Sequence, residues 1–144
     1  MDNLDPYLDR FSESGRRILE SARNETRRRE QNCISPERIL FVLMTEESDL
    51  FNQVMQTFSI DPPSVRTAVE KRLENSRRHT GTGLRIAPDT TDVFRHSMDR
   101  ARSEGRTIVD AKDLCLAFVT DKRDLLVDIL QNPEGHNPAF GNFR

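Results

Sequence analysis

Apolar residues recur at helical spacing from Phe11 onward. Between residues 13 and 30 they appear every three or four positions, and arginines and glutamates occupy the opposite face. Ser12 directly precedes this pattern, and its hydroxyl is suited to accept a hydrogen bond from the first turn of a helix. Phe11 stands where a hydrophobic staple would pack. The pattern predicts a helix that begins after Ser12 and ends near Arg29 or Glu30.

The continuous apolar run 39–44 is compatible with either a buried strand or a buried helix by periodicity alone. Its flanks favour a helix. Ser35 is a good N-cap, and Pro36 suits the first helical position because its φ is already helical and its missing N–H is not needed there. The polar residues 45–47 then close the run.

Two more helices are expected in the first half, one over about 48–58 and one that begins at Asp61-Pro62. Residues 77–86 contain two glycines and no periodicity, which predicts an exposed linker. The helical pattern then resumes. Three helix starts are expected there, near Pro88, near Asp110 and near Asp121 or Lys122.

The two halves match each other at an offset of 75 residues. Six apolar pairs carry the match: Ile18/Val93, Ile34/Val109, Ile39/Leu114, Leu43/Phe118, Leu50/Leu125 and Val54/Ile129. A fixed period of this kind indicates an internal repeat. Because one repeat of four short helices would leave its apolar face in water, we expect the two copies to pack together about a pseudo-two-fold axis.

The second copy lacks its last helix. After residue 131 the chain contains two Asn-Pro pairs and two glycines, which do not sustain a helix. The expected fold is therefore all-α, with two pseudo-symmetric repeats. Its expected organisation is an N-terminal arm over 1–10, a double repeat over 11–131 and an irregular tail over 132–144. Within the double repeat, the first copy covers 11–76, the linker 77–86 and the second copy 87–131.

Composition narrows the possible classes of function. The net charge of -2 over 144 residues argues against a dedicated nucleic-acid binder, which carries a clear basic excess. No stretch approaches the roughly 20 apolar residues that span a bilayer. Two cysteines, Cys33 and Cys115, do not make a disulfide framework, so a cytoplasmic compartment is expected. Both align with apolar positions of the other repeat, which favours core thiols over reactive ones.

The sequence carries no pattern typical of an enzyme. Its three histidines, His79, His96 and His136, lack the spacing of metal ligands. The glycines near residue 82 are not followed by the Lys-Ser/Thr of a phosphate loop, and no nucleophile signature is present. We therefore expect no catalytic activity, no cofactor and no metal.

Several segments resemble the Clp repeat. They are F-S-E-S-G-R-R-I-L-E-S-A-R and I-S-P-E-R-I-L-F-V-L, with weaker copies R-I-A-P-D-T-T-D-V-F-R-H-S-M-D-R-A-R and V-D-A-K-D-L-C-L-A-F. Members of the family typically read F-T-E-x-A and then G-T-E-H-I-L-L in each half. The resemblance covers roughly residues 11–130, and Arg38 and Asp113 replace the usual histidine. It implies the N-terminal domain of a Clp-type ATPase chaperone, a mobile appendage that binds adaptors and recruits substrates.

The resemblance also implies a candidate ligand site. In the ClpC-like branch each repeat recognises phosphorylated arginine, and the matching first-repeat positions are Ser12 and Glu37. A carboxylate can form a forked pair with a guanidinium, and a hydroxyl at a helix N-terminus can hold a phosphoryl group. The second-repeat positions, Ala87 and Lys112, have lost both groups. The plainer alternative is that Ser12 only caps a helix and that Glu37 only favours the helix dipole.

The expected function is a protein-binding module that docks adaptors or substrates for a Clp-type unfoldase or protease. The alternative is a stand-alone regulatory protein that binds Clp partners or peptides without delivering them to an ATPase. Expected partners are proteins, not nucleic acid or membrane. A monomer is expected because the repeat pair buries its own apolar faces. Arg27–Arg29 is interpreted as a solvated helix end, with a docking patch for an acidic partner as the alternative.

Overall fold

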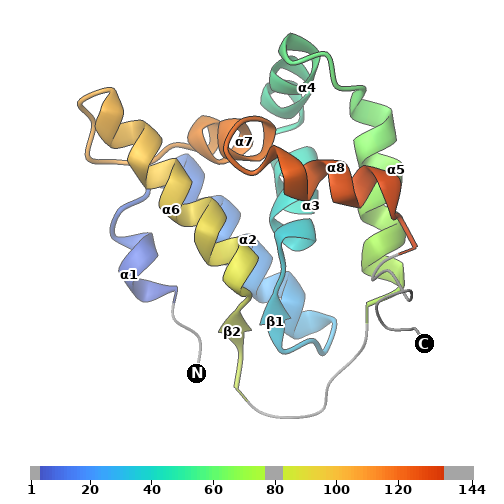
Figure 1. Cartoon of the computed structure of the whole chain (residues 1–144). Helices are drawn as coiled ribbons and strands as arrows, with labels where there is room; N and C mark the ends of the chain where they lie inside the picture. The colour runs from blue at the N-terminus through green and yellow to red at the C-terminus, as the bar shows by residue number, and fades with distance from the viewer. Residues whose placement is uncertain (1–3, 77–82, 135–144) are drawn as a thin grey trace.

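The computed structural model describes residues 4–76 and 83–134, and within these ranges the chain is predominantly helical (Figure 1). The helices are α1 (Asp5–Leu8), α2 (Glu13–Arg28), α3 (Pro36–Glu46), α4 (Ser48–Thr57), α5 (Pro62–Glu74), α6 (Pro88–Ser103), α7 (Ala111–Val119) and α8 (Arg123–Gln131). Two strands of two residues each, β1 (Cys33–Ile34) and β2 (Arg85–Ile86), complete the set. The predicted all-α class is confirmed, and the ambiguous apolar run 39–44 lies inside α3.

Polar caps set the helix starts at the predicted positions. The Ser12 hydroxyl accepts from the Gly15 amide at the start of α2, and the Ser35 hydroxyl accepts from the Arg38 amide at the start of α3. Asp61 caps α5 in the same way. At α7, Asp110 and Asp113 form a capping box. The side chain of each residue accepts a hydrogen bond from the backbone amide of the other.

The repeat is visible in the helix starts. Helices α2, α3 and α4 begin at residues 13, 36 and 48, and α6, α7 and α8 begin 75 residues later, at 88, 111 and 123. The paired apolar positions also match in burial: five pairs are buried in both copies, and Leu50 and Leu125 are both half-buried. Among the described residues, α5 has no counterpart, and it packs between α3 and α8.

Short extended segments cross-link the two repeats. β1 pairs with β2 in parallel, and Phe11 forms an isolated parallel bridge with Val109. These two pairings are related by the 75-residue offset, so the segment before each repeat's first helix lies beside the segment before the other repeat's second helix. The Ser12 amide donates to Val109 O at 2.8 Å, and the Ala87 amide donates to Ile34 O at 3.1 Å. Part of the predicted linker is thus a strand, because these extended backbone groups pair with each other.

Residues 4–10 of the predicted N-terminal arm pack against the rest of the domain. Leu4 is fully buried, and the Tyr7 ring packs against Phe94 with centroids 5.0 Å apart. Phe11 meets the same ring edge-on at 5.8 Å. α1 therefore closes one side of the core, beside α6 (Figure 1).

Close packing explains the one glycine in α2. A Cβ on Gly15 would lie 2.8 Å from Phe11 Cδ2 and 2.9 Å from Val109 O, so a larger residue cannot enter without a shift of the backbone. The equivalent position of the second repeat is Thr90, whose hydroxyl donates to Ile34 O at 2.9 Å. Val109 O and Ile34 O are equivalent carbonyls in the two repeats. Gly15 lets the backbone of α2 come close to the first, and the Thr90 side chain donates a hydrogen bond to the second.

The first residues of the predicted tail, 132–134, are not helical, and they contact α5. Arg72 Nε donates to Asn132 O at 2.9 Å, Asn75 Nδ2 donates to Glu134 O at 3.0 Å, and Lys71 pairs with Glu134 at 3.1 Å. This short segment therefore fastens the end of α8 to α5. The rest of the predicted tail, and the middle of the predicted linker, lie outside the described residues.

Candidate functional site

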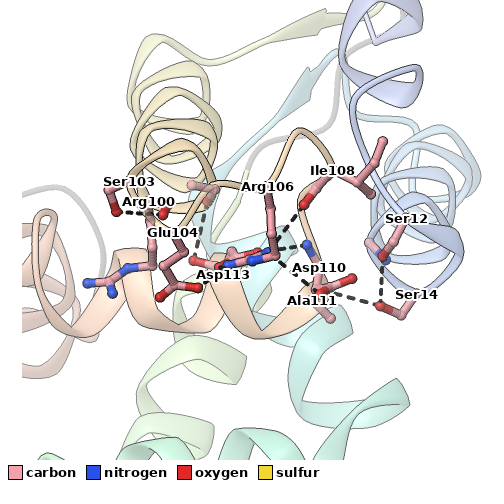
Figure 2. A network of polar contacts seen from close by, with 12 residues as sticks. Ser12, Ser14, Arg100, Ser103, Glu104, Arg106, Ile108, Asp110, Ala111 and Asp113 are labelled. Atoms are coloured by element: carbon pink, nitrogen blue, oxygen red, sulfur yellow. Dashed lines mark hydrogen bonds and ion pairs between the residues drawn. The ribbon is translucent and has the colours of Figure 1, made fainter.

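Ser12 lies where the two repeats meet. Its hydroxyl accepts from the Gly15 amide at 3.3 Å and lies 3.2 Å from the Ser14 hydroxyl. Ser14 Oγ in turn accepts from the Ala111 amide in the first turn of α7, at 3.3 Å. Figure 2 shows this contact between the starts of α2 and α7. Ser12 therefore caps its own helix and faces the second repeat.

Glu37 lies in the first turn of α3 and is already paired. Its Oε2 accepts from Arg72 Nη1 at 2.7 Å, and both side chains are mostly buried, with exposed fractions of 14% and 12%. Arg72 also donates to Asp128 Oδ2 at 2.7 Å and to two backbone carbonyls, Asp128 O and Asn132 O. Glu37 thus belongs to a network that joins α3, α5 and the end of α8.

No contact joins Ser12 to Glu37 in the described part of the chain. The pairing of the repeats places Ser12 beside the start of α7, where Lys112 is the counterpart of Glu37. By the same pairing, Ala87 lies beside the start of α3, where Glu37 is found. A hydroxyl and a carboxylate that meet at such a pair of helix starts would therefore come from different repeats. The first pair keeps only the hydroxyl, from Ser12, and the second keeps only the carboxylate, from Glu37.

Asp113 is a buried carboxylate whose two oxygens both accept hydrogen bonds. It is 2% exposed, and it accepts from Arg106 through both oxygens, at 2.8 and 2.9 Å, and from the Asp110 amide at 2.9 Å. Burial opposes ionisation, but the hydrogen bonds from Arg106 and Asp110 hold the pKa of Asp113 below its usual value. Figure 2 shows this pair at the start of α7, together with Glu104, which also pairs with Arg106 at 2.6 Å.

Arg38, the first-repeat counterpart of Asp113, is a buried guanidinium with few hydrogen bonds. It is 3% exposed, and its Nη2 donates only to Gln31 Oε1, at 3.3 Å. Its Nε is buried and has no hydrogen-bond partner among the described residues. The guanidinium lies 5.8 Å from the centre of the Phe41 ring, and burial lowers the pKa of Arg38. Both Gln31 and Phe41 line a cavity of about 620 Å³ beside it.

The two cysteines differ in burial. The Cys115 thiol is buried, which raises its pKa to about 12 and keeps it protonated at neutral pH, whereas Cys33 is only half-buried, so the core-thiol interpretation holds for Cys115 alone. Over residues 4–76 and 83–134, no group of three or more His, Cys, Asp or Glu is arranged to hold a metal ion. No helix in those ranges is long and apolar enough to cross a membrane.

Sequence reasoning proposed Ser12 and Glu37 as site residues, a proposal that stays a prediction, and it assigned no site role to Arg72 or Arg38. Arg72 belongs to a polar stretch of α5 that reads as a solvated face, and its partners lie 35 and 56 positions away along the chain. Arg38 did carry a signal in the sequence, because it and Asp113 stand where members of the Clp family have a histidine.

The structure defines the class of protein: an all-helical domain made of two interlocked repeats. The sequence profile of the Clp repeat (R) N-terminal domain matches residues 10–133. The chain belongs to this family.

Relatives and solved structures agree. The ATP-binding subunit ClpC of the ATP-dependent Clp protease from Staphylococcus aureus (strain USA300) is 28% identical over 123 residues, which are 85% of this chain and 15% of ClpC. The ClpA homolog of Porphyra purpurea is 23% identical over 125 residues, 87% of this chain and 15% of that protein. The chain thus spans about 15% of the length of these curated relatives.

Two solved structures share the fold. The Hsp104 N-terminal domain from Candida albicans superposes with a TM-score of 0.70 at 12% identity, covering 88% of this chain and 83% of that one. The N-terminal domain (1–163) of the ClpV1 ATPase of E. coli EAEC Sci1 T6SS gives 0.70 at 18% identity, covering 92% and 82%. At these identities the likeness concerns the fold.

Proposed function

We propose that this domain docks adaptor or substrate proteins for a Clp-type unfoldase or protease, without catalysing a reaction itself. The observation that carries the proposal is the match of nearly the whole double repeat to the N-terminal domain family of Clp proteins. The polar groups of the site support the same conclusion. They are of the kinds that bind ligands through hydrogen bonds and ion pairs, and the proposed partners are proteins in the cytoplasm.

The test is site-specific photo-crosslinking in cells that make the chain. A crosslinking residue at Ile108 would stand next to the paired starts of α2 and α7, since Ile108 is 42% exposed and immediately precedes the Phe11–Val109 bridge. Arg95, exposed on α6, is the control position. We expect crosslinks from Ile108 to a Clp subunit, an adaptor or a protein under degradation. Crosslinks only to proteins outside the Clp system would contradict the proposal.

Phosphoarginine recognition at Ser12 and Glu37 is a finer proposal. The Arg72 pair shows that the Glu37 carboxylate can hold a guanidinium at 2.7 Å, and the Ser12 hydroxyl stands at a helix N-terminus where anions are favoured. A ligand guanidinium would have to displace Arg72 from Glu37, and its phosphoryl group would meet Ala87 instead of a hydroxyl at the paired helix start, because Ser12 lies beside Lys112. Binding therefore depends on opening the Arg72 network.

Calorimetric titration with a phosphoarginine peptide tests this finer proposal. Glu37→Gln should weaken binding by about 1.5–3 kcal/mol, the range for a hydrogen bond to a charged group, whereas Lys112→Ala should change it far less. An unmodified arginine peptide is the control. If the phosphorylated and unmodified peptides behave alike, Ser12 and Glu37 serve only the fold.

A further inference from the structure

The two repeats bury a charged side chain at equivalent positions, Arg38 and Asp113, but only Asp113 has an ion-pair partner among the described residues. In the second repeat, Asp113 has a forked arginine partner and a backbone amide. In the first repeat, Arg38 has one hydrogen bond of 3.3 Å to a neutral amide, and it makes no ion pair with any described carboxylate. Because the backbone surroundings are equivalent, the second repeat shows what a satisfied buried charge looks like in this fold. Arg38 lacks its counter-charge.

A buried guanidinium without a carboxylate is costly, since it has lost its hydration and gained little in return. Burial, together with the neighbouring Arg29 and Arg28, lowers the pKa of Arg38, and only Glu25 among the nearby groups favours its charge. Glu25 is itself held by hydrogen bonds from Arg28 and Arg29. Within the described chain, then, the positive charge at Arg38 is left without a direct negative partner.

The cavity beside Arg38 has the size and lining of a site for part of a polypeptide. Its volume of about 620 Å³ lies within the range of ordinary ligand pockets. Phe41 and Leu73 supply apolar surface, and Glu70 and Glu74 place two exposed carboxylates on the α5 side. Gln31, the present acceptor for Arg38, is a half-buried side chain after α2, and turning it aside would free Arg38 Nη2 for a ligand.

We propose that this cavity binds an acidic side chain of a partner polypeptide, whose carboxylate accepts from Arg38, with a basic residue next to it paired to Glu70 or Glu74. The inference rests on the proposed docking function, and it names the chemistry of the docked segment. Arg29 also lines the cavity and favours an anionic group, whereas Glu70 and Glu74 repel a doubly charged phosphate more strongly than a singly charged carboxylate. The two glutamates also favour a segment in which a lysine or arginine adjoins the acidic residue.

Peptide titration of the whole chain tests the proposal. The probe is acetyl-Leu-Asp-Lys-Phe-amide, and its control is the same peptide with Asn in place of Asp, which has nearly the same shape and no carboxylate. We expect the Asp peptide to bind about ten- to a hundredfold more tightly, as for hydrogen bonds to a charged group. It should also shift the Nε–Hε resonance of Arg38 in the nitrogen-15 NMR spectrum. Inorganic phosphate, titrated separately, should leave that resonance in place.

The matched variants are Arg38→Met and Arg102→Met. Arg38→Met removes the charge but keeps the length of the side chain, and it identifies the Arg38 resonance by its loss. Because it also removes an unsatisfied buried charge, we expect it to stay folded, which its circular dichroism and thermal midpoint will show. It should abolish the preference for Asp over Asn. Arg102 is exposed on α6 and paired with Asp99, so its variant should keep that preference.

Three results would overturn the proposal. They are equal binding or no binding of the two peptides, a preference for Asp that survives in Arg38→Met, and a shift of Arg38 Nε by phosphate alone. None of them affects the proposed docking function, which is judged by crosslinking at Ile108. Conversely, loss of Clp crosslinks with a retained Asp preference would leave this cavity as a peptide site outside the Clp system.

Discussion

The Arg72 network offers the sharpest test of how the fold is held together. We expect Arg72→Met to destabilise the chain strongly, because methionine keeps most of the apolar stem and removes the guanidinium. That guanidinium donates to Glu37, Asp128 and Asn132, and so ties α3, α5 and the end of α8. In the variant Glu37 would remain mostly buried, at 14% exposure, without its counter-charge.

The magnitude follows from the burial of each partner. The Arg72–Glu37 pair is largely buried, so leaving Glu37 unpaired costs about 2–3 kcal/mol, near the low end of the range for broken buried pairs. The Asp128 side chain is 55% exposed, and its pair with Arg72 adds at most about 1 kcal/mol. We therefore expect the free energy of unfolding to fall by about 3 kcal/mol, part of which a double-mutant cycle with Glu37→Gln should recover as coupling.

Urea unfolding followed by circular dichroism measures this loss. Arg66→Met is the matched control, because Arg66 lies on the same helix, is likewise half-buried, and makes no ion pair with a described residue. The slope of the free energy against urea should be unchanged, so the midpoint reports stability. A loss below about 1 kcal/mol, or one equal to that of Arg66→Met, would refute the reasoning.

Three further outcomes are expected. Gly15→Ala should cost about 1–3 kcal/mol of stability, because its Cβ meets Phe11 and a backbone carbonyl; unchanged urea unfolding would show that the helix shifts freely. The lowered pKa of Asp113 means that its ionisation stabilises the fold above the unfolded pKa of about 3.9 and that this stability is lost as pH falls through the lower folded pKa. Asp113→Asn should therefore flatten the acid limb of a stability–pH profile, and a profile parallel to wild type would contradict this. A chain cut after Glu134 should be more stable than one cut after Gln131 by about 1–2 kcal/mol, and so melt at a higher temperature, since only the longer chain keeps the contacts to Arg72 and Asn75; equal midpoints would show that residues 132–134 add no stability.

Helix starts and the repeat were predictable because their causes are local or periodic. Ser12, Ser35, Asp61 and Asp110 each precede a helix in the structure, and each acts through atoms only a few residues away. The 75-residue offset needed only the order of apolar positions. Local chemistry and spacing therefore sufficed for the architecture.

The candidate site was less predictable, since its contacts join distant parts of the chain. Arg72 reads as a solvated charge until α5 is placed against α3 and α8, and only the pairing of Phe11 with Val109 shows that Ser12 faces the second repeat. Arg38 is a case where burial overrides the usual preference of arginine for the surface. A single sequence carries the charge but not its surroundings.

The docking claim is tested most directly by joining this chain to a Clp-type ATPase ring whose own N-terminal domain has been removed. The measurement is ATP-dependent degradation of a substrate that the intact ATPase processes only with its N-terminal domain. We predict that the fused chain restores degradation and that the same chain added separately does not. A fusion as inactive as the bare ring would contradict the account, and inhibition of the intact ATPase by the separate chain would favour the stand-alone regulator instead.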